Sequence, residues 1–238
     1  MVESGDSSRV FVPLCGKSVD MAYLASNSKV SHVVGIDIIK QAAEDFAHGH
    51  PTLSLMEFQP GNEDPEIACD FKSSGSIFHG DGISIIVDDL FYLLHMHNEE
   101  RAKYINRGST VSPNNDSTFY LFDSIYDRAS MIAIDPSLRN EYATHMGELL
   151  TPGGVMLLVT LERRKVSNDA AKSDGPPFSI SEKEVRQLYE SQKWVETVEL
   201  LEEMDDLTTD DEKQRWEKRG VLELFELVFV IRKKFESK

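Results

Sequence analysis

Short apolar runs alternate along the chain with stretches in which apolar residues recur every three or four positions. An apolar run is typical of a buried strand, and the three-to-four spacing is typical of one face of a helix. Strands are predicted at residues 9–14, 31–36, 118–126, 155–161 and 222–231, and helices at residues 18–26, 39–48 and 137–150, with another opening at Ser181. Because strands alternate with helices, the pattern favours an α/β fold, a doubly wound and mostly parallel sheet with helices on both faces.

Several boundaries carry recognisable end signals. Ser18 is placed to cap the first helix, and Ser181 with Glu184 forms a capping-box pattern. The sequence TPGG at residues 151–154 ends the third helix. The continuous apolar run that follows, VMLLVTL, is what a central parallel strand requires.

Three segments fit this rhythm less well. Residues 57–82 are rich in glycine, serine and acids and contain strand-like pieces, which suggests a hairpin. Residues 99–117 are polar and rich in turn formers, so we interpret them as a solvated loop, or a helix end with a disordered insertion, in preference to a functional lid. The acidic residues 202–212 are interpreted as a solvated loop or helix face.

Composition indicates an ordinary globular protein. Of its 238 residues, 40% are hydrophobic, and we expect a single domain at residues 9–235 after a short polar tail at residues 1–8. No apolar run approaches the roughly 18 residues that span a bilayer, and the first residues lack the apolar stretch of a signal peptide. The two cysteines, Cys15 and Cys69, form no CxxC pair. We therefore predict a cytoplasmic protein with reduced thiols.

Net charge narrows the range of partners. The formal charge is −16 and the sequence pI is about 4.8, so the surface repels phosphate backbones and anionic membranes. His95 and His97 flank Met96 without a cage of cysteines or carboxylates, so no metal site is predicted. We expect a monomer that binds a small molecule, with no nucleic acid or membrane partner.

The turn after the first predicted strand is the first candidate for chemistry. It reads PLCGKS, with Gly16 ahead of a helix whose first N–H groups are free. The Gly-Lys-Ser tripeptide suggests a phosphate-binding loop. That motif requires another glycine where Phe11 stands, which excludes a nucleotide triphosphatase of this type.

Asp37 ends the second predicted strand and follows Gly16 by 21 residues. In a Rossmann-like unit this position places a carboxylate where it accepts hydrogen bonds from both ribose hydroxyls. The alternative is that Asp37 caps the following helix. A dinucleotide site usually has three glycines in the first turn, whereas this turn has one, so a cofactor without a pyrophosphate is favoured.

Four motifs in order give the chain a more specific resemblance. They are RVFVPLCGKSVDMAYLA followed by HVVGIDI, FDSIYDRA at residues 122–129, GPPF at residues 175–178, and LFE at residues 224–226. Together they resemble the thiopurine S-methyltransferase family. The plant-type halide and thiol methyltransferases belong to the same broad group, but the PLCGK and GPPF forms favour the thiopurine branch.

The resemblance implies a fold and an activity. The fold is a class I methyltransferase sheet of seven mostly parallel strands, one of them reversed at the edge. The activity is transfer of a methyl group from S-adenosylmethionine to the sulfur of a small aromatic or heterocyclic thiol, without a metal. A non-catalytic relative that binds the cofactor, a halide or thiol methyltransferase and, less favoured, a dinucleotide-dependent oxidoreductase stay open as alternatives.

The resemblance also implies site residues. Cofactor contacts are expected from Leu14 and Gly16 beside the methionine part, Asp37 at the ribose, Asp89 and Leu90 beside the adenine, and Arg128. Arg128 and Arg215 are the expected catalytic residues, and Pro176, Pro177, Phe178 and Arg215 are expected to contact the substrate.

Physical chemistry agrees with these roles. Aromatic thiols are acidic enough to need no dedicated base, and a guanidinium near the sulfur favours the thiolate. The plainer alternatives are an ion pair of Arg128 with Asp127, a helix-surface charge for Arg215, and a simple turn for the two prolines.

This sequence departs from the family in one expected feature. Relatives carry a tryptophan-bearing segment before the first strand that covers the cofactor. Here eight residues precede Arg9, while Trp194 and Trp216 lie late in the chain. We therefore expect an uncovered site with weak cofactor binding and slow turnover.

Overall fold

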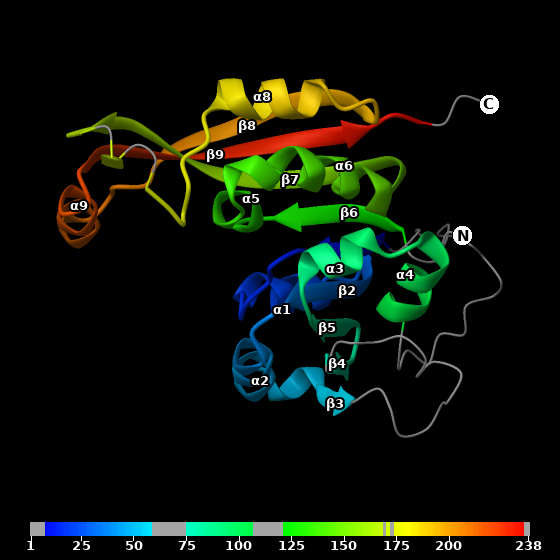
Figure 1. Cartoon of the computed structure of the whole chain (residues 1–238). Helices are drawn as coiled ribbons and strands as arrows, with labels where there is room; N and C mark the ends of the chain where they lie inside the picture. The colour runs from blue at the N-terminus through cyan, green and yellow to red at the C-terminus, as the bar shows by residue number, and fades with distance from the viewer. Residues whose placement is uncertain (1–7, 59–74, 107–120, 169, 172–173, 236–238) are drawn as a thin grey trace. The chain divides into compact units, whose positions relative to one another are not determined.

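The computed structural model describes residues 8–58, 75–106, 121–168, 170–171 and 174–235. The chain divides into two compact units, Met1–Asp123 and Ser124–Lys238, and the division falls within strand β6 (Phe122–Asp127) (Figure 1). The predicted alternation of strands and helices is confirmed through the described residues. None of the described helices is both long and apolar enough to cross a bilayer.

The first unit is organised around three parallel strands. β1 (Ser8–Val12), β2 (Val30–Asp37) and β5 (Ile83–Val87) are neighbours in that order, all parallel. Beyond β5 the sheet continues with β4 (Ile77–Gly80), which is antiparallel to β5, and then with β3 (Met56–Phe58), which is antiparallel to β4. The strand-like pieces predicted within residues 57–82 are therefore present and pair as in a hairpin, although residues 59–74 lie outside the described residues.

Four α-helices and one short 3-10 helix accompany this sheet. They are α1 (Val19–Ala25), α2 (Lys40–Gly49), the 3-10 helix η1 (Pro51–Leu53), α3 (Leu90–His95) and α4 (Asn98–Ile105). Ser18 caps α1 as predicted, because its hydroxyl accepts the N–H of Asp20. Helix α4 occupies the beginning of the segment predicted to be an insertion, and Tyr104 within it is buried. Residues 107–120 of that segment lie outside the described residues.

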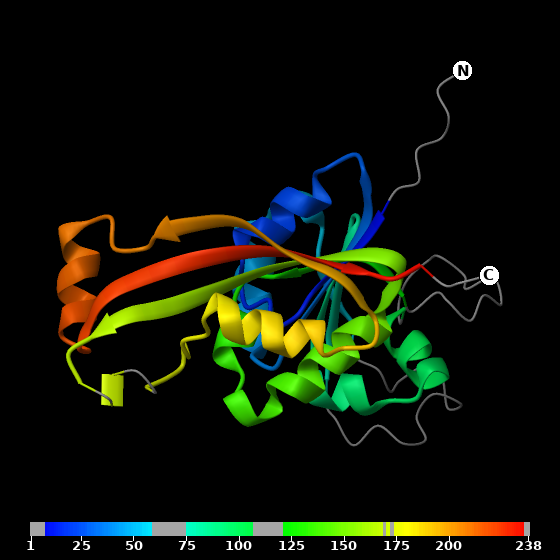
Figure 2. The same cartoon turned by 90° about the horizontal axis from the view of Figure 1, so that it is seen from above.

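The second unit is dominated by three long antiparallel strands. β7 (Leu150–Val166) pairs with β9 (Val221–Lys233), which pairs in turn with β8 (Val195–Asp205). Figure 2 shows these three strands side by side with α9 at one end. The strand predicted at residues 155–161 is confirmed within β7, which lies between β6 and β9 in the sheet and pairs with β9 in an antiparallel register. An apolar run predicts that a strand is buried, but it does not predict the direction of that strand relative to its neighbours.

The helices of the second unit are α5 (Ser130–Ala133), the 3-10 helix η2 (Pro136–Leu138), α6 (Arg139–Leu149), α8 (Glu182–Glu190) and α9 (Asp210–Glu217). The capping box at Ser181 and Glu184 is present at the start of α8. The acidic stretch at residues 202–212 is not one loop or one helix face, because it contains the end of β8 and the start of α9. Helix α9 is anchored by a core of Leu207, Trp216, Val221 and Leu224.

The described residues hold nine strands where seven were expected. Two of the described strands, the parallel β5 and the antiparallel β8, lie outside the predicted strand ranges and the predicted hairpin. β8 has a mostly exposed side-chain pattern, so it lacks the apolar run by which buried strands are recognised.

Candidate functional site

The turn after β1 contains two residues with positive φ angles. Leu14 and Gly16 have φ angles of 41° and 51°, in the left-handed region that glycine adopts at little cost. The N–H of Cys15 donates to Ile36 O at 2.9 Å, which ties the turn to β2. A Cβ built at Gly16 would meet no atom within 4 Å. Glycine is therefore required here for its backbone angle, and the space above it is open.

Asp37 fastens this turn to the end of β2. Its Oδ2 accepts the N–H of Gly16 at 2.9 Å and its Oδ1 accepts the N–H of Ile39 at 2.9 Å. The contact with Ile39 is a local turn bond ahead of α2, whose N-cap is Ile39 and has no side-chain cap, so Asp37 is not the cap of that helix. The contact with Gly16 reaches 21 residues away. A carboxylate has about four acceptor positions, so each oxygen keeps capacity for a further donor.

The end of β5 lies beside the end of β2. Asp37 and Val87 are directly paired in the parallel register, and the N–H of Asp88 donates to Asp37 O at 3.1 Å. Asp88 is buried and accepts hydrogen bonds from the Tyr104 hydroxyl and from the N–H of Asp89. Asp89 is exposed and caps α3 by accepting the N–H of Phe91 at 2.8 Å.

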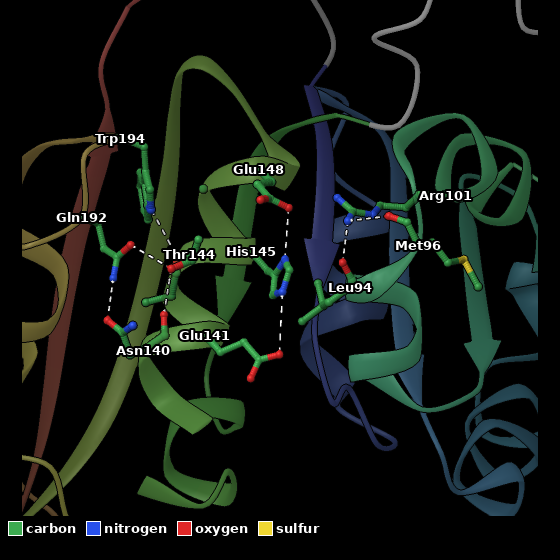
Figure 3. Close-up of polar contacts among 12 residues, drawn as sticks. Leu94, Met96, Arg101, Asn140, Glu141, Thr144, His145, Glu148, Gln192 and Trp194 are labelled. Atoms are coloured by element: carbon green, nitrogen blue, oxygen red, sulfur yellow. Dashed lines mark hydrogen bonds and ion pairs between the residues drawn. The ribbon is translucent and has the colours of Figure 1, made fainter. Parts of the chain in front are cut away.

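Leu90 and Arg101 hold α3 in place. The Leu90 side chain is only 2% exposed, so it belongs to the core and leaves Asp89 as the accessible member of the predicted pair. Arg101 is buried and donates from Nη2 to Leu94 O and Met96 O at 2.5 and 3.0 Å, at the carboxyl end of α3 (Figure 3). Sequence analysis did not single out Arg101, because the three-to-four pattern does not distinguish a buried arginine from a surface one.

The side chain of Cys15, a residue of this turn, lies beneath it and is not a reactive thiol. Its side chain is buried, and a Cβ at Gly35 would lie 2.7 Å from both Cys15 Sγ and Met21 Sδ. Burial raises the pKa of the Cys15 thiol well above its usual range, and the nearby Asp37 charge adds to the shift. A protonated, buried thiol is inert as a nucleophile, so Cys15 fills space under the turn.

In the second unit, Asp127 and Arg128 face different surroundings. Asp127 is fully buried and accepts the Tyr142 hydroxyl at 2.7 Å and the N–H of Ser130 at 2.8 Å. Burial raises the pKa of Asp127, and these hydrogen bonds oppose the shift. Asp127 thereby holds the start of α5.

Arg128 is exposed and lies near two acids. Burial raises the pKa of Glu226 and of Asp206, and the charge of Arg128 lowers both. Arg128 therefore faces these carboxylates at the surface, while the carboxylate of its neighbour Asp127 is engaged by Tyr142 and the start of α5.

The GPPF segment forms a folded wall before α8. Both proline peptide bonds, Gly175–Pro176 and Pro176–Pro177, are cis. The N–H of Phe178 donates to Ile132 O at 2.6 Å, in the last turn of α5. A Cβ at Gly175 would overlap the Phe178 ring, so the ring lies directly against this glycine.

Arg215 occupies the last turn of α9 and is exposed, as a helix-surface charge would be. The adjacent Trp216 points into the core. The predicted residues thus fall into two groups. Leu14, Gly16, Asp37, Asp89 and Leu90 gather at the carboxyl ends of β1, β2 and β5 in the first unit, and Arg128, Pro176, Pro177, Phe178 and Arg215 belong to the second.

The sequence matches a family model described as thiopurine S-methyltransferase over residues 2–108 and 115–234. The segment left out of the match, residues 109–114, lies within the insertion predicted from the sequence. A thiopurine S-methyltransferase from Pseudomonas fluorescens is 32% identical over 224 residues, which cover 94% of this chain and 81% of the relative.

Solved structures show the fold. A SAM-dependent methyltransferase from Methanosarcina mazei superposes with a TM-score of 0.55 at 13% identity, covering 97% of this chain and 94% of that one. The N-methyltransferase NodS from Bradyrhizobium japonicum, solved with S-adenosyl-L-homocysteine, gives a TM-score of 0.50 at 14% identity, covering 98% and 81%. The predicted Rossmann-like, class I methyltransferase fold is thereby confirmed, with more strands than expected.

Proposed function

Because this chain belongs to the thiopurine S-methyltransferase family, we propose that it transfers a methyl group from S-adenosylmethionine to the sulfur of a small aromatic or heterocyclic thiol. The observation that carries the cofactor half of this proposal is the Asp37 carboxylate. Its two oxygens are each held by one backbone N–H, from Gly16 and Ile39, and each keeps capacity for a ribose hydroxyl.

The neighbouring residues fit the rest of the cofactor. The open face of Gly16 lets a ligand approach the backbone closely, and Leu14 shares this turn. Asp89 is exposed at the end of β5, beside the end of β2, where an adenine amino group would find an acceptor. The carboxyl ends of parallel strands are where open α/β sheets bind ligands.

S-adenosylmethionine supplies a methyl group activated on a sulfonium. The acceptor sulfur forms its new bond to carbon as the sulfonium bond to that carbon breaks, the bonding electrons stay on the departing sulfur, and the thiol proton goes to solvent. Arg128 is the group we assign to favour the thiolate, since a guanidinium stays charged at any working pH. Arg215 is the second cation that we assign to the acceptor side.

The acceptor is a small, soft and flat molecule in this proposal. Pro176, Pro177 and Phe178 offer a stiff apolar surface suited to a heteroaromatic ring. The net charge of −16 opposes binding of RNA or DNA. With only two cysteines in the chain and no CxxC pair, we place the activity in the cytoplasm.

Two measurements test the proposal. Thermal shift with S-adenosylmethionine, S-adenosylhomocysteine and NAD is expected to show stabilisation by the first two only, and stabilisation by NAD alone would overturn the cofactor assignment. Turnover with aromatic thiols, thiopurines, halide and hydrogen sulfide is expected to be fastest with the aromatic thiols. Transfer of labelled methyl into RNA at physiological salt would overturn the acceptor class.

A further inference from the structure

Arg163 of β7 binds three backbone carbonyls of the connection that leads to the GPPF wall. Its Nη1 donates to Ala171 O at 2.8 Å and to Asp174 O at 2.5 Å, and its Nη2 donates to Pro177 O at 2.7 Å. The residue is only 5% exposed. A buried guanidinium that satisfies three carbonyls fixes their separation, because its donors form a rigid planar fork.

The same guanidinium also contacts helix α9. The Cζ atom of Arg163 lies 5.4 Å from the centroid of the Trp216 ring, and that of Arg219 lies 4.8 Å from it. Arg219 in turn donates to Asp174 Oδ2 at 2.9 Å, so the Asp174 carboxylate offsets part of the repulsion between the two arginines. Trp216 is next to Arg215 in α9, so Arg163 connects the wall with the helix that carries Arg215.

The wall is held from two further sides. The backbone N–H of Arg163 donates to Ser179 Oγ at 3.0 Å, and Ser179 is the residue after Phe178. The backbone N–H of Phe178 donates to Ile132 O in α5, and α5 begins two residues after Arg128. Arg163 therefore belongs to one bonded arrangement with Phe178 and α5, although it is not itself a wall residue.

We propose that Arg163 is a positioning residue that sets the affinity and selectivity for the acceptor by holding the Pro176–Phe178 wall. The inference rests on the proposed function for the identity of the acceptor, but the positioning role is a property of the wall itself. Without the guanidinium, three buried or half-buried carbonyls lose their donor, and the wall samples positions that no longer fit a flat ring. Orientation of a bound reactant is sensitive to displacements of about 1 Å.

The test compares Arg163→Met, Arg163→Lys and Arg164→Met in the full chain. Methionine fills similar space without donors, and lysine keeps the charge and three donors without the planar fork. Arg164 is the matched control, because it is the next residue and is itself well bonded, to Glu162 and Glu203 at the surface.

Two readouts separate positioning from general stability. Hydrogen exchange at the Phe178 amide is expected to rise at least tenfold in Arg163→Met and less in Arg163→Lys, with no change in Arg164→Met. The KM for an aromatic thiol is expected to rise about tenfold in Arg163→Met, with the Kd for S-adenosylhomocysteine unchanged and with partial rescue by lysine. The preference for an aromatic over a small aliphatic thiol is expected to fall.

The outcomes are distinct. Unchanged exchange at Phe178 overturns the positioning role whatever the activity, and so does an equal loss in Arg164→Met or an equal weakening of cofactor binding. If Arg163→Met does not fold by circular dichroism, Arg163→Lys decides the question by the same two measurements. Absence of turnover in every protein, wild type included, would overturn the proposed function, while the exchange result would still decide the role of Arg163.

Discussion

Replacement of Asp37 by alanine is the most direct perturbation of the proposed cofactor site. The carboxylate accepts one N–H from Gly16 and one from Ile39, both at 2.9 Å, and two acceptor positions remain for the ribose hydroxyls. A hydrogen bond to a charged group contributes about 1.5–3 kcal/mol. Because the two bonds share one carboxylate and are not additive, we take about 3 kcal/mol for the pair, which corresponds to roughly a 100-fold weaker Kd.

Calorimetric titration with S-adenosylhomocysteine measures this change. Asp37→Asn keeps the size and one acceptor oxygen and is expected to give an intermediate loss, about tenfold. Asp81→Ala is the control, because Asp81 is an exposed carboxylate before β5, at the opposite end of that strand from Asp89. Thermal unfolding of each variant shows whether the loss of partners for Gly16 and Ile39 destabilises the fold.

The assignment of Asp37 to the ribose is refuted if the Kd of Asp37→Ala stays within twofold of the wild-type value. It is equally refuted if Asp81→Ala weakens binding as much, since a long-range charge effect would then explain both. A large loss of thermal stability with an unchanged Kd would leave Asp37 with the turn-holding role alone.

Three further predictions concern stability. Burial, the Arg9 charge and His79 lower the pKa of His32 to about 4, so the folded state favours the neutral ring. The free energy of unfolding is therefore expected to fall by about 3 kcal/mol as pH drops from 6.5 to 4. Urea titrations at both pH values check this, and an equal pH dependence in His32→Gln would contradict it. Asp127→Asn is expected to cost about 1–3 kcal/mol in urea unfolding, because an amide cannot accept from all its buried donors; wild-type stability would refute this. Gly147→Ala is expected to cost about 1–3 kcal/mol in calorimetry, because its Cβ would overlap the Trp194 ring, and an unchanged Tm would show that the ring moves freely.

Much of the fold was predictable because its signals are local. The cap of α1 at Ser18 and the capping box at Ser181 join residues two or three positions apart, so the sequence pattern contains both partners. Position along the chain also identified Gly16 and Asp37, since a strand end and a turn are read from neighbouring residues. A second capping box at Thr209 and Glu212 was equally readable but lay inside a stretch interpreted by its charge alone.

What the sequence alone determined is therefore the alternation of elements, the helix ends, the turn with its single glycine, and an acid at the end of the second strand. Only the tertiary structure decided the antiparallel pairing of β7 with β9, the exposed strand β8, the burial of Leu90, and the contacts of Arg163. The physical reason is the same in each case. Strand direction and the burial of a long polar side chain depend on partners far along the chain, such as Trp216 for Arg163, and residue type and spacing do not encode which of those partners will be adjacent.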